Sequence, residues 1–182
     1  MNKIRIYSIL LLLLGSKATF AQQTNSLVSK AATISFFSSA PLEDIEAKSS
    51  LAGSALNIKT GEIIFRVKIT SFQFDKKLMQ EHFNENYMES DKYPFSEFKG
   101  KIGECEKLAK DGTYKLNVSG TLQIHGVGKS YSTAATFNVK NGAINAIAAF
   151  DVRLADHKIS IPSIVGKKIA EVVKVKIEAA YN

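Results

Sequence analysis

The chain has 182 residues, of which 45% are hydrophobic, and a formal net charge of +7. This length suits one globular domain with a sizeable core. Lysine and glutamate are scattered along the chain, and no basic stripe with interleaved aromatic residues indicates nucleic-acid binding. The only cysteine, Cys105, excludes an internal disulfide framework. We expect Cys105 to be a small residue on a strand, and the core alone to stabilise the fold.

The first 21 residues have the features of a secretory signal peptide. Lys3 and Arg5 precede an apolar run from Ile6 to Leu14, and small residues follow up to Ala21. The run is much shorter than the roughly 20 apolar residues of a membrane-spanning helix, so we expect no stable membrane anchor. We predict cleavage after Ala21, a periplasmic or secreted protein, and a single domain over residues 22–182.

The next part of the chain predicts a loose lead followed by strands. We expect residues 22–30 to lack regular structure. Alternating apolar and polar residues then predict strands over Thr33–Ser39 and Leu42–Lys48, and a third over Glu62–Thr70. A turn at Lys59–Gly61 precedes the third strand.

One segment departs from this period of two. Over Asp75–Ser90, the residues Leu78, Met79, His82 and Phe83 have the spacing of one side of a short helix. Asp75 is a candidate N-cap, since its side chain can accept a hydrogen bond from a backbone N–H of the first turn. We therefore predict a helical insert over about residues 75–90.

The C-terminal half predicts long strands and hairpins. Thr113–Ile124 alternates throughout, with Gly120 on its apolar face, where glycine indicates a bend or a close approach by another group. Asn141-Gly142 is a strong hairpin sequence. The remaining predicted strands are Tyr131–Val139, Ile144–Leu154 and Glu171–Tyr181.

This order of strands and turns predicts an all-β, antiparallel barrel or sandwich with one helical insert. Alternation does not distinguish a barrel filled by side chains from a hollow one that holds a ligand, so both interiors stay open.

No catalytic motif stands out in the sequence. His82, His125 and His157 have no partner at metal-ligand spacing, which leaves only a metal site assembled in space. The glycines of HGVGK, at residues 125–129, follow a predicted strand but lead into no helix. We interpret this motif as a tight turn between two strands. We expect no enzyme activity, no catalytic residue, no cofactor and no metal.

Three motifs resemble the YceI-like family of exported, lipocalin-like proteins that bind polyisoprenoid and other lipids. QEHFNENYMESDKYP at 80–94 resembles the family's helical segment with its acidic-Lys-Tyr-Pro ending, and GTLQIHGVGK at 120–129 resembles its Gly-x-Leu-x-Ile-His-Gly-Val-Thr-Lys hairpin. LADHKI at 154–159 stands where the family has an Asp-aromatic-Gly-Ile element. Two positions differ from the family pattern. Gly128 stands where the family hairpin has threonine, and His157-Lys158 stands where the family has its aromatic-Gly pair. The resemblance spans about residues 32–181 and implies a lipocalin-like β-barrel.

The resemblance favours the hollow interior and implies a lipid or polyisoprenoid ligand, held for storage or transport in the cell envelope. Met79 and Phe83 would line or close one end from the insert. Arg66, His82 and His125 are candidates for binding a polar head group at a mouth, with purely structural roles as the alternative. The predicted wall consists of Phe65, Val67, Ile69, Phe72, Phe74, Tyr114, Leu116, Leu122, Ile124, Phe137 and Phe150.

Two other functions remain open at this point. One is a structural or stress-related barrel with a filled core that acts through its surface. The other is a metal protein built on the three histidines.

Overall fold

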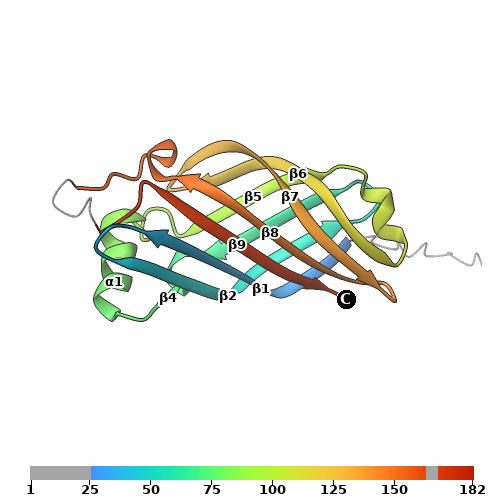
Figure 1. Ribbon diagram of the computed structural model, residues 1–182, viewed down its shortest axis with the longest axis horizontal. Coiled ribbons are helices and arrows are strands. Elements are labelled where there is room, and N and C mark those ends of the chain that lie inside the picture. The colour runs from blue at the N-terminus through green and yellow to red at the C-terminus, as the bar shows by residue number, and fades with distance from the viewer. Residues whose placement is uncertain (1–25, 163–167) are drawn as a thin grey trace, which may run out of the picture.

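The computed structural model describes residues 26–162 and 168–182, so the predicted signal segment lies outside the described residues. Within these ranges the strands form one antiparallel sheet in the order β1-β9-β8-β7-β6-β5-β3-β2-β4, and pairing of β1 with β2 closes it into a barrel (Figure 1). Eight strands form the ring, and the two-residue β4 adds to β2 at its rim. The predicted lipocalin-like barrel is confirmed.

Neighbours in the ring are neighbours in the chain, as in an up-and-down barrel. The strands are β1 (Ser26–Ser39), β2 (Asp44–Asn57), β3 (Glu62–Lys68), β4 (Gln73–Phe74), β5 (Phe95–Ile102), β6 (Gly112–Ile124), β7 (Val127–Lys140), β8 (Ala143–Arg153) and β9 (Val172–Tyr181). The helical segments are η1 (Ile69–Ser71), α1 (Lys77–His82), the π-helical η2 (Phe83–Tyr87), η3 (Cys105–Ala109) and η4 (Leu154–His157).

The C-terminal half follows the predicted alternation closely. On β6 to β9, mostly apolar inward-facing residues alternate with mostly polar exposed ones, which puts one face in the barrel and the other in water. Asn141 and Gly142 both have positive φ, at 52° and 81°. Two such residues give the turn whose twist matches that of the flanking strands.

The N-terminal strands are longer than predicted. β1 begins at Ser26, so residues 26–30 belong to a strand and the expectation of a loose lead is wrong there; residues 22–25 lie outside the described ranges. β2 continues past Lys48 to Asn57. Pairing of the two strands shifts register around Ala32, and such bulges break the period of two that the prediction relied on.

Two smaller predictions are also corrected. Cys105 lies on η3 instead of a strand. The helical insert is present as α1 and η2, but Lys76 occupies the N-cap of α1 with no side-chain cap bond. Asp75 therefore does not cap the helix, which pairing of β4 with β2 and packing of Phe83 hold in place instead.

Gly120 lies opposite Gly100 of β5. A Cβ atom at Gly120 would lie 2.3 Å from the Lys99 carbonyl oxygen and 2.4 Å from the Gly100 Cα. Both atoms belong to backbone, so no side-chain rotation relieves the clash. The close approach indicated by the sequence is therefore present.

We expect Gly120→Ala to lower the free energy of unfolding by about 1–3 kcal/mol, because the added methyl forces β5 and β6 apart. Gly53, on β2, has no atom within 4 Å of a built Cβ. Gly53→Ala is the matched control and should leave stability unchanged or slightly raised. Urea unfolding of both variants checks this, and equal stabilities would contradict the close-packing account.

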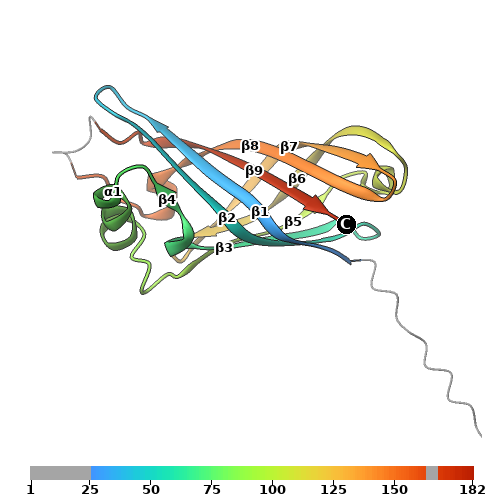
Figure 2. The ribbon, with the colours of Figure 1, turned by 90° about the horizontal axis from the view of Figure 1, so that it is seen from below.

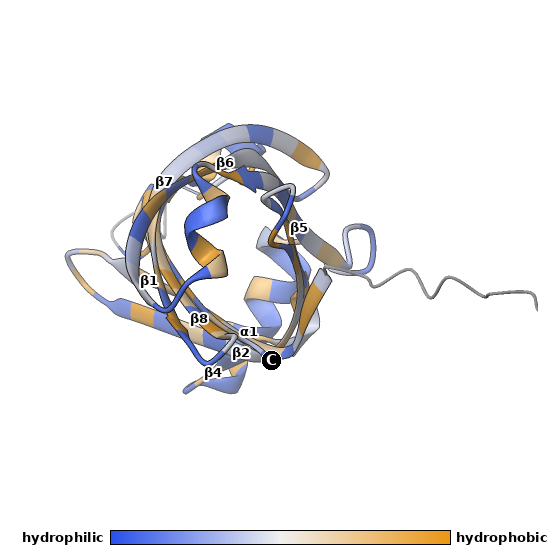
Figure 3. Cartoon of the chain, turned by 90° about the vertical axis from the view of Figure 1, so that its right-hand side faces the viewer, coloured by the Kyte–Doolittle hydropathy of each residue, from blue (hydrophilic) through white to orange (hydrophobic). Residues whose placement is uncertain are grey.

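The two ends of the barrel differ. Figure 3 looks along the barrel from the end opposite α1 and shows the closed ring of strands. At this end Leu108 of η3, which is 2% exposed, packs into the core with Leu56, Ile102 and Tyr181. The Tyr181 hydroxyl lies 2.6 Å from the Ser54 Oγ, and Ser54 donates to the Ile64 carbonyl at 2.7 Å. α1 and the β1–β2 hairpin lie at the other end (Figures 1 and 2).

Candidate functional site

A cavity of about 520 Å³ occupies the part of the barrel nearer α1. This volume is within the usual range of small-molecule sites, about 300–1,000 Å³. Inward-facing residues of the eight ring strands line it, and nearly all of them are apolar. The interior is therefore packed at one end and hollow at the other.

Four phenylalanines form a cluster along one side of this cavity. Phe36 of β1 stacks on Phe83 of η2 at 5.5 Å between ring centroids, and Phe74 of β4 lies 5.0 Å from Phe83. Phe72 contacts both Phe36 and Phe83. These contacts dock the helical insert onto the barrel and give that side of the cavity a dry aromatic wall.

Most of the predicted wall residues lie on this cavity. Tyr114 and Leu116 do not, because the packed core fills the barrel at their level: Leu116 is buried in that core, and the Tyr114 hydroxyl donates to the Lys110 carbonyl at 3.1 Å. The predicted residues that do line the cavity are Phe65, Val67, Ile69, Phe72, Phe74, Met79, Phe83, Leu122, Ile124, Phe137 and Phe150.

The three residues predicted to bind a polar head group lie in different places in the structure. His82, which is exposed at the end of α1, lines the cavity. We call this end of the barrel, where α1 lies, the mouth end. Arg66 points outward from β3, with its guanidinium carbon 3.9 Å from the centre of the Phe95 ring. A β-strand turns alternate residues to opposite faces, so the inward position of Phe65 excludes Arg66 from the cavity. His125 does not line the cavity either.

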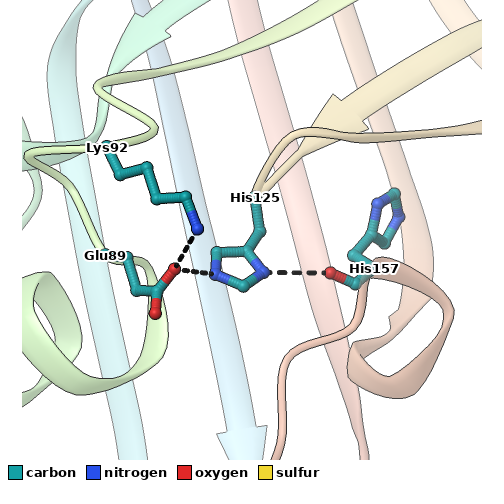
Figure 4. Close-up of polar contacts among 4 residues, drawn as sticks. All are labelled: Glu89, Lys92, His125 and His157. Carbon is teal, nitrogen blue, oxygen red and sulfur yellow. Dashed lines mark hydrogen bonds and ion pairs between the residues drawn. The ribbon is translucent and has the colours of Figure 1, made fainter.

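His125 instead joins three segments at the mouth end (Figure 4). Its Nδ1 lies 3.2 Å from the His157 carbonyl oxygen, and its Nε2 lies 3.2 Å from a Glu89 carboxylate oxygen. Both partners are acceptors, so both bonds together require the ring to carry a proton on each nitrogen. Glu89 also pairs with Lys92. His125 thus links the β6–β7 turn, the insert and η4.

The turn that carries His125 has the geometry expected from the HGVGK motif. His125 and Gly126 have φ values of 52° and 72° and form a two-residue hairpin between β6 and β7. A Cβ at Gly126 would lie 2.5 Å from the Tyr93 ring, so glycine lets the insert pack closely here. The prediction of a tight turn is confirmed.

His157, which is fully buried, forms a second polar link behind the cavity wall. Its Nδ1 donates to the Val127 carbonyl at 3.0 Å, which leaves Nε2 to accept the Tyr131 hydroxyl at 3.0 Å. Tyr131 lines the cavity. Burial lowers the pKa of His157 and raises the pKa of Tyr131, so both groups are held neutral.

We expect the stability of the protein to fall as the pH drops below about 6.5, the ordinary pKa of histidine. The unfolded chain then takes up a proton on His157 before the folded chain does, which favours unfolding. Urea unfolding between about pH 7 and pH 5 measures this slope. His157→Gln, compared with the parent over the same range, should reduce it, and parallel slopes would show that other groups cause the dependence.

Sequence reasoning missed several residues that face the cavity. Ile34, Phe36 and Ile45 come from β1 and β2, and Val175 and Ile177 come from β9. The alternation of Ile34 with Phe36 and of Val175 with Ile177 was visible, but it did not show which strands surround the hollow part.

Across residues 26–162 and 168–182, no group of three or more histidine, cysteine, aspartate or glutamate side chains is placed to hold a metal ion. None of the helices in these ranges is long and apolar enough to cross a membrane.

Comparison with known proteins identifies the barrel. Residues 16–181 match the YceI-like domain family. No curated protein gives a match. Among solved structures, a polyisoprenoid-binding domain from Saccharophagus degradans, implicated in plant cell wall breakdown, is similar with a TM-score of 0.77 and 15% identity, covering 88% of this chain and 99% of that one.

Two further structures have the same fold. BcnA of Burkholderia cenocepacia gives a TM-score of 0.65 and 15% identity, covering 83% of this chain and 96% of that one. A YceI protein of Campylobacter jejuni gives 0.57 and 19%, covering 72% and 80%. At these identities the likeness concerns the fold alone.

Proposed function

Because the chain belongs to the YceI-like family, we propose that it is an exported lipid-binding protein, not an enzyme. It encloses the apolar part of an amphiphilic, isoprenoid- or fatty-acyl-like ligand and stores or transports it in the cell envelope. The observation that carries this proposal is the 520 Å³ cavity with its almost wholly apolar wall. Export is inferred from residues 1–21 of the sequence.

The energetics of such a site suit a lipid tail. Each buried methylene gains about 0.8 kcal/mol, so a tail of roughly ten would gain on the order of 8 kcal/mol before ordering costs. Micromolar affinity corresponds to about 8 kcal/mol. A longer tail gains more than this, which offsets the cost of ordering the ligand. Binding of this kind needs no catalytic group.

The cavity also separates this function from the alternative of a filled barrel acting through its surface. A filled core explains the end that holds Leu108 and Tyr181 but not the open space beside Phe150 and Ile177. The similar fold of the polyisoprenoid-binding domain from Saccharophagus degradans supports a lipid as the ligand class.

Native mass spectrometry of the protein purified from a bacterial host tests the proposal. We expect a population carrying an additional lipid mass that disappears after extraction with organic solvent. The emptied protein should then bind the neutral dye N-phenylnaphthylamine, with an increase in dye fluorescence. A protein that carries no lipid and fails to bind the dye would count against a ligand-binding role.

A further inference from the structure

Charged side chains around the cavity are confined to a few positions. Those that line it are Glu43, Lys76, His82, Glu97 and Lys168. Two of them are carboxylates, and each is paired with a lysine. Glu43 accepts from the Lys76 Nζ at 2.7 Å, and Glu97 pairs with Lys99, which follows it on β5. The two carboxylates are therefore already neutralised.

Lys168 and His82 have no such partner. Among the described residues, no carboxylate oxygen lies within 4.0 Å of either side chain. Lys168 precedes β9, and its segment is tied to the barrel because the Ala170 N–H donates to the Ser38 Oγ at 2.9 Å. Ser38 also lines the cavity. This bond holds the backbone that follows Lys168 against β1, beside the cavity.

Among the described lining residues, Lys168 is thus the one lysine without a carboxylate partner, which leaves a single unpaired positive charge beside an apolar cavity. Lys168 lines the cavity from the segment before β9, and Lys76 and His82 line it from the start and the end of α1. A cationic head group would be repelled by the unpaired charge of Lys168.

We propose that the ligand is an anionic single-chain amphiphile. Its carboxylate, or a similar anionic head group, lies at the mouth beside Lys168, with Lys76 and His82 nearby, and its tail fills the cavity. This inference rests on the proposed lipid-binding function and narrows it. A lysine ammonium pairs with a carboxylate, whereas a neutral alcohol gains only a hydrogen bond.

The experiment compares three ligands that share one tail and differ in head-group charge. Palmitate, hexadecanol and hexadecyltrimethylammonium are titrated against the protein loaded with N-phenylnaphthylamine, each below the concentration at which it aggregates. We expect palmitate to displace the dye at the lowest concentration and the cationic amphiphile at the highest. Added salt should reduce the difference, since the head group is solvent-exposed.

Two variants test whether Lys168 causes the preference for an anionic head group. Lys168→Glu should weaken palmitate binding about fivefold and improve binding of the cationic amphiphile. Lys140→Glu changes the net charge equally, but Lys140 lies at the closed end, beside the β7–β8 turn. It should leave all three affinities unchanged.

A third variant should strengthen palmitate binding, whereas Lys168→Glu weakens it. Glu43→Gln frees Lys76 from its carboxylate partner and should tighten palmitate binding about twofold to threefold. A merely structural effect of losing this contact would weaken binding of all three ligands together.

The outcomes separate this inference from the function on which it rests. Equal displacement by the three ligands, or equal effects of the Lys168 and Lys140 variants, would overturn the anionic head group while leaving the lipid-binding function intact. If none of the three displaces the dye and no lipid co-purifies, both proposals fail.

Discussion

Replacing Ala148 by tryptophan is expected to weaken lipid binding by at least about tenfold, or about 1.4 kcal/mol. Ala148 lies on β8, faces the cavity, and is paired with Ile177 and Ala135 across the adjacent strands. The indole would occupy space that the ligand tail needs. Because that space is empty of side chains, the free energy of unfolding should change by no more than about 1 kcal/mol.

Ala149→Trp is the matched control, since Ala149 is the next residue of β8 and is exposed on the outer face. It should bind N-phenylnaphthylamine and palmitate as the parent does. The chain has no tryptophan of its own, so the fluorescence of each variant also reports its environment. We expect blue-shifted emission from the inward tryptophan and water-exposed emission from the outward one. Equal binding by the two variants would place the ligand outside the barrel.

The second large effect concerns stability. Phe137→Ala is expected to lower the free energy of unfolding by about 3–5 kcal/mol. Phe137 is 1% exposed and lies where the packed core meets the floor of the cavity. Its ring therefore contacts side chains on nearly all sides, and truncation removes these contacts and leaves a void.

Phe150→Ala, on β8, provides the comparison. Phe150 packs against Tyr131 at 5.7 Å between ring centroids, but its other side faces the cavity. Because the folded protein already leaves part of this ring without partners, its truncation should cost clearly less than that of Phe137. Chemical denaturation of both variants measures the difference. Equal losses would mean that the cavity is filled by protein atoms, contrary to the geometry described above.

The sequence by itself determined the strands and turns that depend on neighbouring residues in the chain. An unbroken period of two defined β6 through β9, and Asn141-Gly142 and His125-Gly126 defined their turns, because both pairs adopt positive φ. Gly120 indicated a close approach for a similar reason: only a residue without a side chain fits there. Prediction failed at residues 26–30 and beyond Lys48, where a register shift and small inward residues hide the alternation.

The sequence also determined which residues face inward, but only the tertiary structure decided whether an inward residue borders packed core or empty space. Leu116 and Leu122 lie on the same face of β6, yet Leu116 is in the core closed by η3 and Leu122 lines the cavity. His125, predicted as a head-group ligand, is held by Glu89 and the His157 carbonyl. Lys168 lines the cavity from a segment that is bonded to β1 through Ala170 and Ser38. Periodicity along one strand reports the face of each residue, whereas cavity and mouth depend on groups that approach from distant parts of the chain.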